Sequence, residues 1–347
     1  MKLRTHINLG GHRVCMVYRS PDSGCGIATF QQHLVTAMRR HGIDAASCNV
    51  AFDTYNGSEV TLVHYSPAMW EGHTDLFDEV LARAVQGLVI IVLHSLQPPQ
   101  VQEYLSEPRC RDIGCHLRAM LRANVVIVSL SASCTHCLES WETALSARTV
   151  TSAHPGLFVH TSPSAGAHPY AFFGGVIRPK KDPTSSAIRV LLESIQGVGV
   201  DVWVHSSNVS DLSAMPSALG VWRQTIGVMN DRQWSEAISL ARAVLCPYNT
   251  QIQCVSGVIA EAISAGTNVI ATSFPFALEL AAAYPDYIYV ENELAVWPRV
   301  VGRLGEGRLE PARIPSWSAL LGAVEMAARI ASNGRWRSNK AFQLTTR

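Results

Sequence analysis

The sequence of 347 residues has no marked excess of charge of either sign, because its basic and acidic residues nearly cancel to a formal net charge of +1. Charged residues make up only 16% of the chain, and hydrophobic residues make up 48%. This balance argues against a broad surface for nucleic acid, whose binding proteins cluster lysine and arginine. We therefore expect a folded, somewhat apolar protein without a nucleic-acid partner.

Long hydrophobic runs are also lacking. The longest aliphatic run, Leu88 to Leu93, has the length of a strand and is far short of the ~20 residues that cross a bilayer. The first residues, MKLRTHINLGGHRV, lack the long apolar core of a signal peptide. These absences predict a cytoplasmic protein. The basic residues of the tail 335–347 suggest a solvated tail, with weak peripheral contact with anionic lipid at the inner membrane face as the alternative.

The cysteines show no spacing typical of a disulfide framework. There are nine, an odd number, scattered along the chain, and this indicates reduced thiols. Cys134 and Cys137 have C-x-x-C spacing, but no second pair lies at the distance that zinc sites need, so we expect buried thiols and no metal. G-x-S-x-G, Walker and H-E-x-x-H patterns are absent.

The sequence does contain a regular alternation of apolar runs and helical patterns. This alternation predicts α/β architecture, with parallel sheets covered by helices on both faces, and the length suits two domains that each bury a core. The clearest helix is Gly26 to His41, with Ile27, Phe30, Leu34 and Ala37 on one face. The expected strands lie near 14–18, 45–50, 61–64, 88–93, 125–129, 148–152, 172–176, 201–205, 224–228, 243–246, 268–271 and 287–290.

The best linker candidate is the stretch His160 to Ala171, which is rich in Ser, Gly and Pro. It divides the chain into an N-terminal Rossmann-like domain, 1–165, and a C-terminal one, 166–325. A final helix and basic tail, 326–347, could cross back to the first domain. Two doubly wound halves place a cleft between their strand C-termini, which is the expected binding position for such sheets.

The most informative segment is Cys246 to Leu280, CPYNTQIQCVSGVIAEAISAGTNVIATSFPFALEL. It predicts a strand end, a polar loop, a short helix that begins after the N-cap Ser256 and ends before Gly266, and a second buried strand. Glu261 is the one carboxylate in this small, apolar helix. A buried acid is costly unless a partner compensates it, and a ligand hydroxyl is a plausible partner at such a turn.

This segment resembles the nucleotide-sugar site of the retaining GT-B glycosyltransferases of family 4. Their pattern runs Pro, a short loop, an acid, seven residues, a second acid, then Ala and a small-Gly turn. Here Glu261 matches the second acid, whereas Gln253 stands at the first, where a glutamate is usual. Some members with a Q-x-x-S-G-x-x-A loop share this feature. The resemblance implies two Rossmann-like doubly wound domains facing across a cleft, and it covers nearly the whole chain.

Two glycine turns extend the resemblance. After the first strand, Gly24 and Gly26 precede a helix in a turn similar to the G-G-I-A-x-F turn of family 4, near the donor phosphates. The alternative is a tight turn that needs glycine only for its shape. At the start of the second half, Gly175 and Lys181 keep the family's glycine-to-lysine spacing. Val176 replaces the usual arginine, and Arg178 is its expected substitute.

A histidine completes the set of candidates. His94 follows the strand 88–93, where many retaining GT-B enzymes hold a histidine beside the anomeric centre, although a lone histidine is more often structural. His64, at another strand end, is a weaker candidate. Asp231 is expected to cap the helix that follows the strand 224–228.

The resemblance also implies roles for these residues. Glu261 would bind the ribose hydroxyls and Gln253 would face the donor sugar. Ser256 and Gly257 would offer amides to the phosphates, while Lys181 and Arg178 would neutralise the leaving diphosphate. His94, Lys181 and Gln253 are therefore the predicted catalytic residues.

The predicted reaction is the transfer of a hexose-type sugar from a nucleotide-diphosphate sugar, with retention of configuration and without a metal or a further cofactor. UDP and GDP are the expected nucleotides. A carbohydrate, a lipid-linked molecule or a small molecule is the expected acceptor, and Tyr55, Tyr65 and Trp70 could stack on a sugar or simply pack.

Three other functions stay open, and one of them, a transferase that acts on nucleic-acid bases, gains no support from the near-neutral charge. A non-catalytic GT-B homologue that acts as a nucleotide-binding or partner subunit would explain the missing glutamate and arginine. A nicotinamide-dependent oxidoreductase is disfavoured because the turn at Gly24 and Gly26 lacks the third glycine of the dinucleotide fingerprint.

Overall fold

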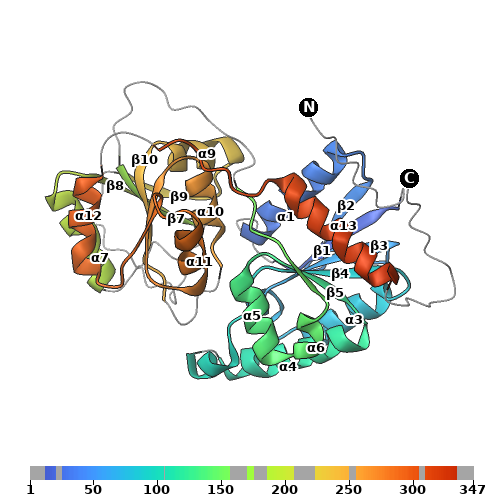
Figure 1. The fold of residues 1–347 in the computed structure, drawn as a ribbon. Helices are drawn as coiled ribbons and strands as arrows, with labels where there is room; N and C mark the ends of the chain where they lie inside the picture. The colour runs from blue at the N-terminus through green and yellow to red at the C-terminus, as the bar shows by residue number, and fades with distance from the viewer. Residues whose placement is uncertain are drawn as a thin grey trace. The chain divides into compact units, whose positions relative to one another are not determined.

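The structure is a computed structural model that describes residues 12–20, 26–104, 106–156, 170–175, 186–206, 223–249, 255–304 and 309–333. The chain divides into two compact units, which we call the first and the second domain (Figure 1). The first domain comprises Met1–His154 and Pro315–Arg347, and the second comprises Pro155–Ile314. The predicted boundary at 165/166 lies outside the described residues.

The first domain is built on a six-stranded parallel sheet of order β2-β1-β3-β4-β5-β6. From β1 the chain adds β2 on one side of the sheet, and from β3 onward it adds strands on the other side. The carboxyl ends of β1 and β3 therefore form a topological switch point. The elements are β1 (Val14–Tyr18), α1 (Gly26–Arg40), β2 (Ala45–Asn49), β3 (Val60–Tyr65), α2 (Pro67–Trp70), α3 (Thr74–Ala84), β4 (Leu88–Leu93), η1 (Pro99–Tyr104), α4 (Glu107–Arg122), β5 (Val126–Ser129), α5 (Ala132–Trp141), α6 (Thr143–Ser146), β6 (Thr149–Thr151) and α13 (Trp317–Asn333).

The second domain has its own six-stranded parallel sheet, of order β12-β11-β10-β7-β8-β9. This is the Rossmann strand order, and its switch point lies between β7 and β10. The elements are β7 (Tyr170–Gly175), α7 (Ser186–Gly197), β8 (Asp201–Ser206), β9 (Arg223–Ile226), α9 (Asp231–Ser239), β10 (Ala241–Cys246), α10 (Gly257–Ser264), β11 (Asn268–Ala271), α11 (Pro275–Ala283), β12 (Ile288–Val290), η3 (Leu294–Val296) and α12 (Trp297–Arg303).

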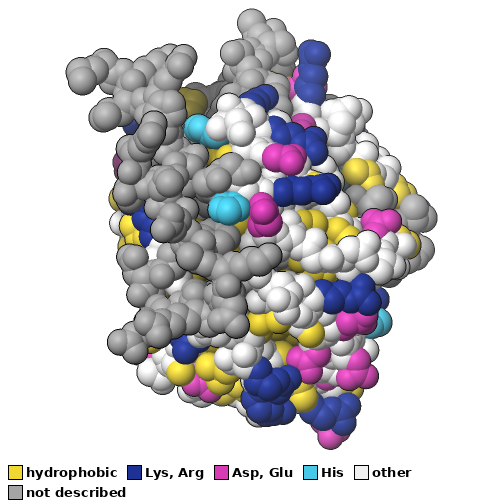
Figure 2. All heavy atoms as spheres, turned by 90° about the vertical axis from the view of Figure 1, so that its right-hand side faces the viewer, with side chains coloured by type: hydrophobic (Ala, Val, Ile, Leu, Met, Phe, Trp, Pro, Cys, Tyr) yellow, Lys and Arg dark blue, Asp and Glu magenta, His cyan; other side chains and the backbone are white. Residues whose placement is uncertain are grey.

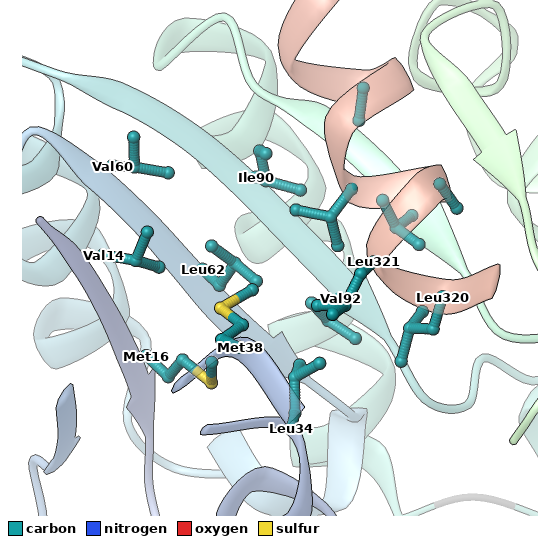
Figure 3. Packing of buried hydrophobic residues seen from close by; sticks show 14 of the residues in the cluster. Val14, Met16, Leu34, Met38, Val60, Leu62, Ile90, Val92, Leu320 and Leu321 are labelled. Atoms are coloured by element: carbon teal, nitrogen blue, oxygen red, sulfur yellow. The ribbon is translucent and has the colours of Figure 1, made fainter. Parts of the chain in front are cut away.

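Helix α13 belongs to the core of the first domain, although it follows the whole second domain in the sequence. Its residues Leu320, Leu321 and Val324 are fully buried in one cluster with Leu34 of α1 and Val92 of β4. Figure 3 shows Leu320 and Leu321 beside Val92 and Leu34. The predicted division at 325/326 falls inside this continuous helix.

The second sheet is covered on both faces, as the strand pattern shows. Phe172 and Phe173 are neighbours on β7 and both are buried, but they belong to different apolar clusters. Because neighbouring residues of a strand point to opposite faces, each cluster fills one side of the sheet. Helices α9, α10 and α11 contribute to one cluster, and α7 and α12 contribute to the other.

All twelve predicted strands are present, with some shifted ends. The strand expected at 224–228 stops at Ile226 because Gly227 has a φ of +112°, outside the extended region. The predicted linker is wrong at its end. Tyr170 and Ala171 are buried in β7, where the Tyr170 hydroxyl donates to the Ala237 carbonyl at 2.7 Å.

Charges of both signs alternate on the face drawn in Figure 2, where Lys and Arg side chains lie beside Asp and Glu. Ion pairs within the first domain include that of Arg122 with Asp78 at 2.9 Å. Among the helices within the described ranges, none combines the length and the apolar character needed to cross a membrane.

Candidate functional site

The carboxyl ends of β7 and β10 meet at the switch point of the second sheet, and the predicted donor residues Ser256, Gly257 and Glu261 follow β10 in the chain. β7 ends at Gly175, which has a φ of +120°, a conformation that side chains rarely adopt. A Cβ at Gly175 would lie 3.9 Å from Cγ2 of Val258, in the first turn of α10. The end of β7 therefore adjoins the start of the helix that carries Glu261.

Glu261 is half-buried and has a specific partner. The indole Nε1 of Trp234, on α9, donates to Oε2 of Glu261 at 2.8 Å. Burial raises the pKa of Glu261 to about 7, while the Trp234 hydrogen bond lowers it and the charge of Asp231 raises it further. In the described part of the chain no cation pairs with this carboxylate.

Ser256 is the residue before α10, as predicted, but its side chain does not cap the helix. The prediction that its hydroxyl accepts from the first-turn amides is wrong. Its Oγ instead donates to the hydroxyl of Tyr248 at 3.4 Å, because Tyr248 is buried and a buried hydroxyl needs a partner. The side chain of Ser256 thus leaves the amides at the start of α10, from Gly257 onward, uncapped.

The end of α10 agrees with the prediction. Gly266 follows the helix with a φ of +74°, the left-handed conformation in which glycine is favoured. A Cβ at this position would also lie 2.3 Å from the carbonyl oxygen of Leu309, so both conformation and space require glycine.

The helix that carries Trp234 begins one residue earlier than predicted. Asn230, not Asp231, is the N-cap of α9. Its Oδ1 accepts from the Gln233 amide at 2.9 Å, and Oε1 of Gln233 accepts from the Asn230 amide at 3.0 Å. This reciprocal capping box satisfies two amides that the helix leaves open, and so it fixes the start of α9.

In the first domain, His94 lies directly after β4 and is bound to a second histidine. Nδ1 of His64 is 2.8 Å from Nε2 of His94, and the two rings stack with centroids 5.1 Å apart. Phe30 of α1 packs edge-on against His94 with a centroid distance of 4.7 Å. The weaker histidine candidate therefore lies in contact with the stronger one.

Both histidines are neutral at pH 7. Burial lowers the pKa of His64 to about 3. The pKa of His94 lies well below its usual value, first because of burial and then because of the charges of His64 and His154. Nε2 of His64 is buried without a partner in the described structure. A buried N–H without an acceptor is rarer than an unpaired acceptor, so the arrangement favours a hydrogen on Nδ1 of His64, donated to His94.

Gly26 begins α1, and a Cβ there would meet no described atom within 4 Å. The described fold thus makes no steric demand for glycine at this position. Gly24, Arg178, Lys181 and Gln253 lie outside the described residues, so their predicted roles stay predictions.

The aromatic residues considered for an acceptor sugar pack in the core instead. Tyr65 and Trp70 are fully buried against Phe77, and Tyr55 is 4% exposed. Trp70 also donates from its indole to the His64 carbonyl at 3.0 Å.

The C-x-x-C thiols agree with the prediction, since Cys134 and Cys137 are both buried on α5. Throughout the described ranges, no group of three or more His, Cys, Asp or Glu is placed to hold a metal ion.

Known structures match both domains together. Sucrose-phosphate synthase from Thermosynechococcus elongatus is 13% identical, covers 93% of this chain and 99% of its own, and has a TM-score of 0.58. The glycosyltransferase WaaG, involved in lipopolysaccharide biosynthesis, is 14% identical over 93% and 96%, with a TM-score of 0.59. The chain has the GT-B fold.

AviGT4, a glycosyltransferase involved in avilamycin A biosynthesis, shares this fold at 15% identity over 93% of this chain and 97% of its own, with a TM-score of 0.51. No family model and no curated protein matches the sequence. Within the GT-B fold, Gly175, Ser256 and Glu261 lie together at the carboxyl edge of the second sheet, and His94 lies at that of the first.

Proposed function

We propose that this protein is a glycosyltransferase that moves a hexose-type sugar from a nucleotide-diphosphate sugar to an acceptor, with retention of configuration and without a metal. The observation that carries the proposal is Glu261. It is a half-buried carboxylate at the switch point of the second sheet, and among the described residues it is held by a neutral indole donor and not by a cation. Such a carboxylate gains most from a ligand that brings hydroxyl donors.

The proposal assigns the donor to the second domain. Glu261 accepts from the ribose hydroxyls, and the amides from Gly257 onward, which the side chain of Ser256 does not cap, bind phosphate oxygens at the positive end of α10. Lys181 and Arg178 neutralise the diphosphate as the glycosidic bond breaks, and Gln253 binds a sugar hydroxyl without supplying charge.

His94 contacts the donor sugar in this proposal. Because His94 is neutral, it can hydrogen-bond a sugar hydroxyl but cannot serve as a cation at neutral pH. The bond from His64 fixes its ring and, in the tautomer argued above, leaves its Nδ1 hydrogen for the ligand. Cytoplasmic location and a carbohydrate, lipid-linked or small-molecule acceptor belong to the same proposal.

A second candidate is a GT-B homologue that binds nucleotide without turnover. It is favoured by Gln253 at the position of the usual glutamate and by Val176 at that of the usual arginine. Both losses remove charge from the reaction centre. Neither removes Glu261 or Lys181, so this homologue would still bind nucleotide.

The test is a thermal-shift and calorimetric screen of UDP, GDP, ADP, TDP and NAD. A ligand at 100 times its dissociation constant should stabilise the protein by about 2.7 kcal/mol. We expect one nucleoside diphosphate to bind, and we expect Glu261→Ala and Lys181→Ala each to abolish binding. Glu236→Ala is the matched control, because Glu236 forms a solvent-exposed ion pair with Arg232 on α9.

Turnover then separates the two candidates. Release of the nucleoside diphosphate from the matching nucleotide sugar supports the enzyme, whereas binding without release supports the inert homologue. If no nucleoside diphosphate binds, or if NAD alone binds, the proposal is wrong.

A further inference from the structure

The indole of Trp234 donates a hydrogen bond to the Glu261 carboxylate, and Trp234 is itself fixed by several contacts. Its ring packs edge-on against Phe172 of β7, with centroids 5.6 Å apart, and lies 6.1 Å from the ring of His205 at the end of β8. Its amide bonds to the carbonyl of the capping residue Asn230 at 2.9 Å. The contacts with β7 and β8 and the capped start of α9 therefore fix the direction of the indole N–H.

We propose that Trp234 is a positioning residue for nucleotide binding: its indole N–H holds Oε2 of Glu261, so that Oε1 is presented to the ribose hydroxyls. This inference rests on the proposed function, because the ribose belongs to the nucleotide of the sugar donor. The role differs from simple packing, since an indole nitrogen can only donate a hydrogen bond.

The electrostatics of the pair agree with this role. A hydrogen bond to a carboxylate is stronger when the carboxylate is ionised, so Trp234 favours the charged form that accepts from hydroxyls. It lowers the pKa of Glu261, whereas burial, the larger effect, raises that pKa to about 7. The other titratable groups that face the pair from described residues are Asp231, Tyr248 and His205. Asp231 disfavours the ionised form of Glu261, burial and the charge of Glu261 raise the pKa of Tyr248, and burial lowers the pKa of His205.

Two substitutions distinguish the effect of the Trp234 N–H donor from the effect of its aromatic ring. Trp234→Phe keeps an aromatic ring and removes the N–H, and Trp234→Gln loses the ring and keeps an N–H donor. If Trp234 only packs, Gln is the more damaging change. If Trp234 positions Glu261, the titration midpoint of Glu261 should stay closer to that of the native protein in Trp234→Gln than in Trp234→Phe.

Trp203→Phe is the matched control. Trp203 packs against the same Phe172, and its indole donates to the Thr225 hydroxyl at 2.8 Å and not to the Glu261 carboxylate. The Trp203→Phe substitution removes an indole N–H from the same aromatic cluster without removing a partner of Glu261.

The first measurement needs no ligand. In the full chain with 13C-labelled glutamate carboxyls, the Glu261 signal is identified by its loss in Glu261→Gln and is titrated by NMR. We expect Trp234→Phe to raise the midpoint by about one pH unit. We expect Trp234→Gln to restore it in part and Trp203→Phe to leave it unchanged.

The second measurement uses calorimetry at pH 7 with UDP and GDP, each beside its 2′-deoxy analogue. For whichever ribonucleotide binds, Trp234→Phe should weaken affinity about tenfold, and it should weaken the 2′-deoxy analogue clearly less. An equal loss for both ligands would overturn the inference.

The two measurements distinguish the ways in which the inference can fail. If a nucleotide binds but the Glu261 midpoint is the same in Trp234→Phe, Trp234 has no positioning role and the proposed function stands. If the midpoint moves but none of UDP, GDP, ADP and TDP binds, the proposed function is wrong, and the role toward ribose is lost with it.

Discussion

The His64–His94 contact places two imidazoles, without any described carboxylate partner, in the interior of the first domain. Their hydrogen bond depends on strand register, since His64 of β3 is paired with Val92 of β4 and His94 comes two residues later. The His94 amide also bonds to the Tyr65 carbonyl at 2.9 Å, which holds the chain beside β3 just past the strand end. The pair is neutral and buried, and it makes the stability of the domain sensitive to acid.

We predict that the free energy of unfolding falls as pH falls below about 6.5. The pKa of His64 in the folded protein is about 3, below the usual value of 6.5, so the unfolded chain takes up the proton first. The stabilisation by the neutral form is therefore complete above pH 6.5 and declines toward pH 3. Each such histidine contributes about 1.4 kcal/mol per pH unit within this window.

His64→Asn tests this sensitivity by denaturant unfolding at pH 7.5, 6.5, 5.5 and 4.5. Asparagine can still hydrogen-bond His94 but cannot ionise, so the variant should lose stability less steeply with acid than the native protein. The difference in slope isolates His64 from the carboxylates, which both proteins share. Equal slopes would show that His64 does not titrate as its burial implies.

The sequence could nominate single residues but not their contacts. Glu261 could be proposed because it is the one carboxylate in an apolar helix pattern, and His94 could be proposed because it follows a recognisable strand. Trp234 was missed because nothing in the pattern of α9 distinguishes an indole that bonds a carboxylate from one that packs. The partner predicted for Ser256 is wrong, because its hydroxyl bonds the Tyr248 hydroxyl instead. The two hydroxyls are brought together by the three-dimensional fold, which local sequence spacing does not show.

At the scale of elements, the predictions succeeded where strands are buried on both faces. Leu88–Leu93 and Asn268–Ala271 have the bounds expected from the sequence, because their hydrophobic runs start and stop abruptly. Tyr170 and Ala171 were placed in a linker because they follow a Ser/Gly/Pro-rich stretch. Their burial is set by pairing with β8 and β10, which local composition does not reveal.

The end of α10 gives a prediction at this scale. Gly266→Ala should lower the free energy of unfolding by about 2 kcal/mol or more, because alanine is disfavoured at a φ of +74° and its Cβ would overlap the Leu309 carbonyl. Gly42 follows α1 with a φ of +78° but has open space, so Gly42→Ala should cost only about 1 kcal/mol.

Denaturant unfolding of both variants checks the ranking. Similar losses for the two would mean that the contact with Leu309 can relax and that conformation alone decides the cost. A larger loss for Gly266→Ala would tie the turn after α10 to the segment near residue 309.

At the scale of the whole molecule, the first domain is discontinuous in sequence. Its sheet is formed by residues before 152, but one of the helices that cover it is α13, residues 317–333. In Figure 1 this red helix lies with the blue and cyan elements of the first domain. The sequence predicted an amphipathic final helix, but the sheet it covers depends on non-local packing.

Leu321→Ala should destabilise the first domain by about 2–5 kcal/mol, because Leu321 is fully buried against the sheet. Met326, on the same helix, is 56% exposed, and Met326→Ala should change stability by less than about 0.5 kcal/mol. Thermal unfolding of the full chain compares the two. A loss of similar size for both would mean that α13 is held by its outer face as well.

The placement of α13 also orders events during synthesis on the ribosome. The second domain is one uninterrupted segment, 155–314, so all of its residues emerge before α13 does. The sheet of the first domain emerges before the second domain does, yet it lacks the cover of Leu320, Leu321 and Val324 until the second domain has been made. The first domain thus begins to be made before the second domain but completes its core after it. In the interval its apolar sheet is exposed and is a binding surface for chaperones.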